Sequence, residues 1–345
     1  MVDDRVLVGG HHRPLRLGPK SMHRVHVFLN HNASQSAAHD WERLIRTKLY
    51  RSELTFPPPG TTEDFHQAVK AAIVAKVDVL IAVGGDGTIS HLLQELAGHD
   101  TAFLALPAGT ANDLARALGV YASSLQQAVD VVRQDRWKRM DLIRINDRFM
   151  ATNGGIGLVS DVAQLVNRLR VVVPGFRQLM RLIKQEVYGV LMAGSIMTRG
   201  IPLRHLYIES DVYTGEIKTP LLLVNNQPAF AGYFTVAPHT RHDDGAFNVT
   251  FFTPRSTRQF LSSAYRVRRR FGPENDPQIQ SFETNTLKIR ALDGKPLDFI
   301  GDGELLVSDS DILITVVPKA LKVFSQSRPA QMRTVRSMRT RGGVT

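Results

Sequence analysis

Short apolar runs and amphipathic stretches alternate along the first third of the chain. Each apolar run is the length of a buried strand, and each stretch between two runs repeats its apolar residues at helical spacing. The runs fall at residues 25–29, 54–56, 79–83 and 102–106, and the helical stretches at 40–50, 61–73 and 89–98. Strands and helices that alternate at this distance predict βαβ units and a parallel sheet.

The pattern changes after residue 140. Residues 141–151 read as a hairpin, 153–157 as a backbone-exposing glycine loop, and about 159–198 as a helical excursion. The remaining segment, 201–316, consists mostly of short apolar runs between turn residues, which is typical of an antiparallel sandwich. These runs lie at 206–208, 221–224, 234–236, 247–250 and 287–289. The sequence therefore predicts an α/β lobe followed by a β-sandwich lobe.

The third apolar run ends in Gly84-Gly85-Asp86-Gly87-Thr88. Glycines allow the backbone to approach a ligand closely, and N–H groups at the start of a helix bind phosphate. Asp86 would repel a phosphate, and a bridging Mg²⁺ resolves this conflict. The alternative is a tight strand-to-helix turn in which the acid is incidental.

A second loop of this kind follows the next run, at Pro107–Arg116, and contains Gly109, Thr110, Asn112 and Asp113. Consecutive parallel strands place both loops at the carboxyl edge of one sheet, where ligands of open α/β sheets bind. Helix capping is the alternative role for Asn112 and Asp113. Capping explains one polar residue, but it does not explain the whole run.

Composition narrows the class of protein and of partner. The 345 residues are 43% apolar and 22% charged, which is typical of a globular protein. The absence of cysteine excludes disulfides, thiolate nucleophiles and cysteine-ligated zinc, and fits a reducing cytoplasm. We see no secretory signal and no apolar run of transmembrane length. The net charge of +11 favours an anionic partner, namely a nucleotide, a nucleic acid or a membrane surface.

Taken together, the motifs resemble those of the diacylglycerol kinase catalytic-domain family, which includes bacterial lipid kinases and sphingosine kinases. The resemblance spans roughly residues 24–325. Gly-Gly-Asp-Gly-Thr also occurs in NAD kinases, but the later blocks make the resemblance specific. The motifs that carry it are 84–88, 107–116, Met140-Asp141-Leu142, 153–157, Ala237-Pro238, Asp243-Asp244-Gly245 and Asp302-Gly303-Glu304.

This resemblance implies a kinase that uses ATP and Mg²⁺ to phosphorylate a lipid hydroxyl in a cleft between the two lobes. It implies that the end of the chain crosses back to the first lobe, at about residues 315–326. We accordingly divide the chain into a flexible extension (1–21), a nucleotide lobe (22–139), an acceptor lobe (140–314) and a disordered basic tail (327–345).

The resemblance also assigns roles to residues. Asp86 and the loop around it handle the phosphates and the metal, Asp113 lies opposite in the cleft, and Glu304 is the candidate base. Asp244 matches a position that holds a structural Mg²⁺ in some members. The implied ATP-binding residues are Asn30, Gly84, Gly85, Asp86, Gly87, Thr88, Gly109, Thr110 and Asn112. A surface hairpin acid is the alternative for Glu304, and a plain β-turn is the alternative for 243–245.

Two segments depart from the family pattern. The loop after the first strand is Asn30-His31-Asn32-Ala33-Ser34, which lacks the usual proline and glycine and keeps only Asn30. Whether this loop contacts the nucleotide is left open. A glycine-rich segment of the second lobe is replaced by Phe230–Phe234, so the acceptor pocket is expected to differ too.

An acid-free segment at 162–185 suggests how the protein reaches a lipid. Val171-Val172-Val173 reads as an apolar tip, and Arg177, Arg181 and Lys184 form one basic stripe of a helix. Arginines at 266–270 and in the tail add positive charge that attracts anionic lipid. The alternative is an ordinary packed helix with a solvated basic face.

The sequence therefore predicts a cytoplasmic lipid kinase at the inner face of the membrane, with diacylglycerol as the first acceptor. A sphingoid base, ceramide or phosphatidylglycerol is the near alternative, and an NAD kinase or an inactive lipid-binding regulator the more distant one. No recognition motif supports a nucleic-acid partner. The sequence leaves open whether the protein forms a homodimer.

Overall fold

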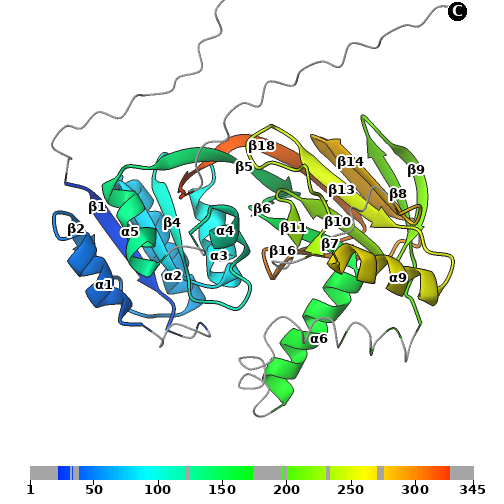
Figure 1. Ribbon diagram of the computed structural model, residues 1–345, viewed down its shortest axis with the longest axis horizontal. Helices are drawn as coiled ribbons and strands as arrows, with labels where there is room; N and C mark the ends of the chain where they lie inside the picture. The colour runs from blue at the N-terminus through cyan, green and yellow to red at the C-terminus, as the bar shows by residue number, and fades with distance from the viewer. Residues whose placement is uncertain are drawn as a thin grey trace, which may run out of the picture.

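The computed structural model describes residues 22–31, 33, 39–120, 124–173, 191, 194, 196, 200–230, 234–269 and 276–326. These residues form two lobes that are bridged by long strands (Figure 1). Arg177, Arg181 and Lys184, which the sequence places on a basic stripe, lie outside the described residues. No helix among the described residues is long and apolar enough to cross a bilayer.

The first lobe is built on four parallel strands in the order β2-β1-β3-β4. The strands are β1 (Arg24–Leu29), β2 (Glu53–Thr55), β3 (Val79–Gly84) and β4 (Ala102–Pro107). Every residue of β3 is buried, as expected for a parallel strand covered on both faces. The strand order reverses between β1 and β3, so the loops that follow these strands diverge and leave room for a ligand.

Helices cover both faces of this sheet (Figure 1). They are α1 (Trp41–Lys48), α2 (Thr62–Val74), α3 (Asp86–Leu96), α4 (Asp113–Ala117) and α5 (Leu125–Arg133). Local sequence explains their ends: Thr61 and Asp64 form a capping box at the start of α2. Past the end of α3, Gly98 takes a positive φ of 82°. The sequence pattern predicts α1 to α4 and misses α5.

The second lobe is a sandwich of two largely antiparallel layers. One layer extends the first sheet through β5 (Trp137–Ile145), β6 (Arg148–Met150), β8 (Arg204–Ser210), β9 (Thr214–Thr219), β15 (Thr286–Ala291) and β18 (Asp311–Phe324). The other layer has the order β14-β13-β10-β7-β16-β17. Its strands are β7 (Asn153–Gly157), β10 (Leu221–Asn225), β13 (Phe247–Phe252), β14 (Ile279–Thr284), β16 (Leu297–Gly301) and β17 (Glu304–Asp309).

Three further elements lie on the outer face of the second layer. They are α6 (Leu158–Val172), α9 (Thr257–Arg268) and a two-stranded ribbon of β11 (Ala229–Phe230) and β12 (Phe234–Thr235). Residues from all of them join an apolar cluster with Leu223 and Phe252. The sequence predicts α6 but misses α9, whose residues were included in the β-rich segment.

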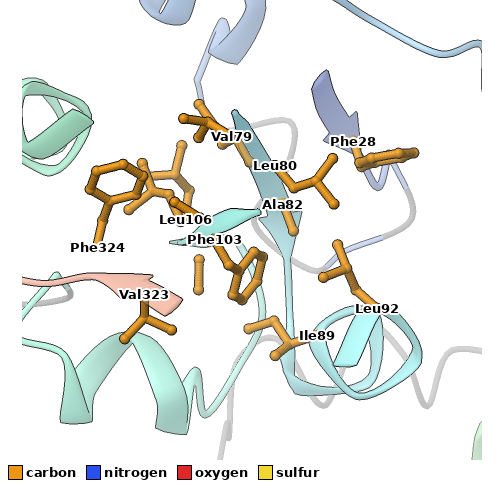
Figure 2. Close-up of a cluster of buried hydrophobic side chains, with 14 of the residues drawn as sticks. Phe28, Val79, Leu80, Ala82, Ile89, Leu92, Phe103, Leu106, Val323 and Phe324 are labelled. Carbon is orange, nitrogen blue, oxygen red and sulfur yellow. The ribbon is translucent and has the colours of Figure 1, made fainter. Parts of the chain in front are cut away.

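The strands β5 and β18 run antiparallel to each other and pass from one lobe to the other (Figure 1). Near its end β18 turns parallel to β4, with Val323 opposite Phe103. Figure 2 shows Val323 and Phe324 in the core of the first lobe, close to Phe103 and Leu106. The predicted lobe boundary at residues 139 and 140 falls inside β5, and the division into domains stays a prediction.

One sequence expectation is wrong. Residues 153–157 were expected to form a backbone-exposing loop, but they form β7, a fully buried strand between β10 and β16. The glycines are needed because neighbouring strands lie very close. A Cβ on Gly154 would lie 2.5 Å from the carbonyl oxygen of Ile300, and a Cβ on Gly155 would lie 3.0 Å from the Leu223 side chain. Close packing, not exposure, explains this glycine run.

Candidate active site

The two glycine loops touch at the carboxyl edge of the parallel sheet. Gly85 connects β3 to α3, and Gly109 lies in the loop between β4 and α4. A Cβ on Gly85 would lie only 3.0 Å from the Cα of Gly109, so neither position has room for a side chain. The structure thus brings together the two loops that the sequence singled out.

Asp86 joins these loops. It is the first residue of α3, and its carboxylate accepts the N–H groups of Asp113 at 2.7 Å and Asn112 at 3.0 Å. The acid of the first loop therefore caps the helix that follows the second loop. Asp113 begins that helix, and its backbone N–H bonds directly to Asp86. It therefore lies next to Asp86, whereas the resemblance implied a position opposite it.

Asn112 stabilises the second loop instead of facing outward. Its side chain is fully buried, accepts the N–H of Gly109 and donates to the carbonyl of the same residue, both at 2.8 Å. Its φ is 53°, a left-handed conformation that asparagine tolerates better than most residues. The side chain that was expected to contact ATP is therefore used to shape the loop. Thr110 lies half-buried in the same loop.

Asn30 follows β1 and reaches the first glycine loop. Its side-chain amide donates to the Thr88 hydroxyl at 2.7 Å, and its backbone N–H donates to Val83. A surface pocket lined partly by Asn30, His31 and Trp41 opens here, next to the point where the strand order reverses. The retained asparagine of the divergent loop thus belongs to the same site as Thr88.

Glu304 reaches this site from the second lobe. It is the first residue of β17, and its carboxylate lies where a side chain on Gly87 would be. A Cβ on Gly303 would lie 3.7 Å from the Cβ of Asp86. Glu304 and Asp86, which are far apart in the sequence, therefore face the same small volume between the lobes.

The turn that carries Glu304 is fixed. Asp302 and Gly303 have φ values of 48° and 82°, as in a type I′ hairpin turn, for which Asp-Gly is a favoured sequence. The Asp302 carboxylate is buried and accepts the N–H groups of Ala151 at 2.7 Å and Thr152 at 2.9 Å, and also the Thr152 hydroxyl. The sequence motifs assigned no role to Asp302 itself. The Asp-Gly pair was the available signal.

The site concentrates negative charge. Burial raises the pKa of Asp86. The N–H groups of Asp113 and Asn112 and the charge of Arg116 act in the opposite direction, but burial is the larger effect. Burial also raises the pKa of Asp302 to about 6, and the charge of Asp86 adds to this effect. An anionic phosphate enters such a site favourably only together with a cation.

The donor set fits Mg²⁺. This ion usually keeps several waters and binds one or two carboxylates together with substrate phosphates, not a cage of protein ligands. No cluster of three metal-ligating side chains occurs within the described part of the chain. Asp86, at the start of α3, is the carboxylate that would bind the ion together with the phosphates. The carboxylate oxygen at the first turn of α3 is a hard donor of the type that Mg²⁺ prefers.

The proposed structural metal position lies elsewhere. Asp244 accepts the N–H of Ala246 at 3.2 Å, as in a β-turn, and its neighbour Asp243 pairs with Arg241. Burial, together with the charges of Asp141 and Asp243, raises the pKa of Asp244. The turn alone explains the backbone bond, so the metal assignment of Asp244 stays a prediction.

The membrane tip is described only in part. Val172 ends α6 and is 74% exposed, and Val173 is 40% exposed. In Figure 1 the far end of α6 extends away from both sheets. Membrane contact through this tip stays a prediction.

A two-lobed fold with paired glycine loops and opposing acids defines a phosphotransferase of the NAD kinase and diacylglycerol kinase type. The diacylglycerol kinase catalytic domain matches residues 24–145, and the YegS C-terminal NAD kinase beta sandwich-like domain matches residues 160–325. The chain belongs to the diacylglycerol kinase catalytic-domain family and is a lipid kinase.

Relatives and solved structures agree with this assignment. A diacylglycerol kinase of Mycobacterium tuberculosis is 30% identical over 227 residues, which cover 64% of this chain and 69% of that protein. One of Bacillus subtilis is 26% identical, covering 69% and 76%. A crystal structure of a diacylglycerol kinase from Bacillus anthracis covers 90% of this chain and 99% of its own, with a TM-score of 0.65 and 18% identity. These findings confirm the predicted fold class and family.

Proposed function

We propose that this lipid kinase transfers the terminal phosphoryl group of ATP, with Mg²⁺, to the hydroxyl of a membrane lipid. Diacylglycerol, which would yield phosphatidic acid, is the first acceptor, because the curated relatives carry that name. A sphingoid base, ceramide and phosphatidylglycerol are the alternative acceptors. The observation that supports the proposal best is the position of Glu304 against Gly87, beside Asp86.

The first lobe binds the nucleotide in this proposal. Backbone N–H groups at the start of α3, from Gly85 to Thr88, are oriented to donate to phosphate oxygens, since helix N-termini favour anions. Asn30 fixes the Thr88 hydroxyl at this place. Gly84, Gly109 and Thr110 shape the adjoining backbone, and Asn112 holds the second loop in position for that contact.

Asp86 would hold Mg²⁺ together with the phosphates of ATP. When bound, the cation supplies charge neutralisation for the phosphoryl group in transfer. Asp86 also orders α4 through two N–H groups, so its side chain is fixed before ligands arrive. Asp113, held next to it, adds negative charge on the same side of the cleft and strengthens its preference for a cation.

Glu304 acts as the general base. Its carboxylate accepts the proton of the lipid hydroxyl while the hydroxyl oxygen forms a bond to the terminal phosphorus and the bond to ADP breaks. A base must be held within hydrogen-bond reach of that proton. The pinned Asp302-Gly303 turn meets this requirement, because it fixes the first residue of β17 over the glycine loop.

The acceptor comes from a membrane, so the protein is proposed to bind peripherally at the cytoplasmic face, with Val172 as one contact. The deciding experiment incubates the purified chain with labelled ATP and a panel of lipid alcohols in mixed micelles, with NAD as a control acceptor. We expect a labelled phospholipid that requires Mg²⁺. Label in NAD alone would contradict the proposal, and lipid binding without transfer would indicate an inactive regulator.

A further inference from the structure

Three buried asparagines form a row across the second layer of the sandwich. Asn153 of β7 lies opposite Asn225 of β10, and Asn225 lies opposite Asn248 of β13. Directly opposed residues of antiparallel strands point to the same face of a sheet. Their side chains are 4%, 0% and 7% exposed, respectively. Such a row is unusual on a covered face of a sheet, where buried polar groups need partners.

The row begins next to the Asp302-Gly303 turn that carries Glu304. The N–H of Asp302 donates to the carbonyl of Asn153 at 3.2 Å, and the next residue, Gly154, pairs with Gly301 at the start of the same turn. Neighbouring strands lie about 4.8 Å apart. Asn153 therefore lies one strand spacing from the turn that carries Glu304, and Asn225 lies two strand spacings from it.

Two of these asparagines keep an acceptor without a partner. The side-chain oxygens of Asn153 and Asn225 are buried and accept no hydrogen bond from any described residue. The carbonyl of Ala229 fixes the orientation of the Asn153 amide, whose nitrogen donates to it at 2.5 Å. The amide nitrogen of Asn225 donates to the Asn248 oxygen at 3.3 Å. The sheet thus offers two unused acceptors near the reacting centre.

Asn248 differs from the other two. Its oxygen also accepts the Thr250 hydroxyl at 2.7 Å, and its nitrogen donates to Ser281 at 2.8 Å. Within the row, the side-chain oxygens that accept no hydrogen bond from a described residue are therefore those of Asn153 and Asn225, the two asparagines nearest the turn.

The same face of the sheet turns apolar beyond the row. Leu223 lies two residues before Asn225 on β10, and Phe252 lies on the same face of β13 as Asn248. Both belong to the apolar cluster that also contains Phe230 and Phe234 of the β11–β12 ribbon. A polar end at the reacting centre followed by an apolar surface matches the layout of a lipid, with its head at the phosphate and its chains beyond.

We infer that Asn153 and Asn225 recognise a second hydrogen-bond donor of the acceptor lipid, on the carbon next to its reacting hydroxyl. This inference rests on the proposed function. Carboxamide oxygens accept bonds and so select an amide N–H or a second hydroxyl. Among the proposed acceptors, ceramide, a sphingoid base and phosphatidylglycerol carry such a donor. Diacylglycerol has only the hydroxyl that reacts, so this inference ranks the alternative acceptors above the one named first in the proposed function. The row lies beside the β11–β12 ribbon, which the Asn153 amide contacts at Ala229.

The test compares two short-chain acceptors that differ in one group. One is a diacylglycerol, and the other has the ester oxygen at its central carbon replaced by N–H. A site with a buried acceptor discriminates strongly in favour of the ligand that donates to it. We expect kcat/KM of the wild-type protein to be at least about tenfold higher for the amide. Asn153→Leu and Asn225→Leu, which keep the side-chain shape, should bring this ratio close to one.

Thr250→Val is the matched control, because it removes a buried polar group on the same face without touching either unused oxygen. It should keep the wild-type ratio. A wild-type ratio near one overturns the inference and indicates that buried water fills the row. This measurement needs only the wild-type protein, so it tests the inference even if a leucine variant does not fold. A ratio that survives both leucine substitutions overturns it as well. Absence of transfer to any lipid alcohol would overturn the proposed function, whereas transfer without discrimination overturns only this inference.

Discussion

The side chain of Glu304 packs directly against the backbone of Gly87. The carboxylate of Glu304, at the start of β17, lies where the Cβ of any other residue at position 87 would be. Gly87 belongs to the first turn of α3 and shares that turn with Asp86. Because residue 87 has no side chain, the carboxylate of Glu304 from the second lobe can approach the glycine loop of the first lobe.

Gly87→Ala should therefore impair catalysis more than folding. The added methyl group displaces the flexible end of Glu304, and small overpacking changes cost about 1–3 kcal/mol. We expect kcat to fall at least about tenfold, since a misplaced catalytic group costs this much or more. Steady-state kinetics and thermal melts check it. Gly194→Ala is the control, because a Cβ there meets nothing within 4 Å. Equal activity in both variants would contradict the contact.

Glu304→Gln keeps the shape of the side chain and removes its basicity. If Glu304 is the general base, kcat should fall by a factor on the order of 10²–10⁴ with little change in KM for ATP. The measurement is a kinetic titration of ATP at saturating acceptor. A higher KM with normal kcat would instead make Glu304 a nucleotide-binding residue.

Asp86 has two functions that different substitutions separate. Asp86→Ala removes the proposed metal ligand and both caps of α4, so we expect lost transfer and a stability loss of about 1–2 kcal/mol. Asp86→Asn keeps one side-chain oxygen as a cap and should recover part of the stability, yet lose at least ~3 kcal/mol of transition-state stabilisation. Urea denaturation and turnover are compared for the two variants. An active asparagine variant would remove Asp86 from the metal site.

His91 should make the protein less stable in mild acid. Burial lowers the pKa of His91, and the charges of His66 and Arg148 lower it further. His66 contacts His91 at 3.3 Å and Glu95 at 3.1 Å, and Lys70 pairs with Glu95. Because the folded state binds this proton more weakly, stability is retained above the unfolded pKa of about 6.5 and lost as pH falls below it.

Substitution of His91 tests this linkage. Between pH 7.5 and 5.5, His91→Gln should lose less free energy of unfolding than the wild type, by at most about 1.4 kcal/mol per pH unit. Urea denaturation at the two pH values measures the difference. His205→Gln, at an exposed site on β8, is the control. Identical pH slopes in wild type and His91→Gln would exclude His91 as the source.

The projecting end of α6 should bind anionic vesicles. Val172→Asp places a charge on a 74% exposed apolar side chain and should reduce co-sedimentation with such vesicles several-fold. Reversing the charges of Arg177, Arg181 and Lys184 should weaken the free energy of vesicle binding by about 1 kcal/mol per residue. Salt should screen this effect. Activity on a short-chain acceptor should persist in both variants.

Val74→Asp is the matched control for this experiment, because Val74 is 82% exposed on α2 in the first lobe. Vesicle binding that is unaffected by salt, by Val172→Asp and by the triple charge reversal would show that the membrane contact lies elsewhere.

The sequence by itself determined the local structure of the first lobe and of the loops. Helical spacing and apolar runs are local signals, and they located β1, β3 and β4 to within a residue or two. The glycines after β3 and β4 are also a local signal. They predicted phosphate loops, because a backbone that approaches a ligand closely requires residues without side chains. These local signals predicted α1 to α4 and the strands of the first lobe, but they missed α5.

Tertiary structure alone decided which of these residues meet. The glycines of β7 are the same residue type as those of the two glycine loops, yet they belong to a buried strand because neighbouring strands leave no room for side chains. The cap that Asp86 provides for α4, the pinned turn of Asp302 and the asparagine row all join residues distant in sequence. No local pattern encodes such contacts, because they exist only when strands are paired in one register.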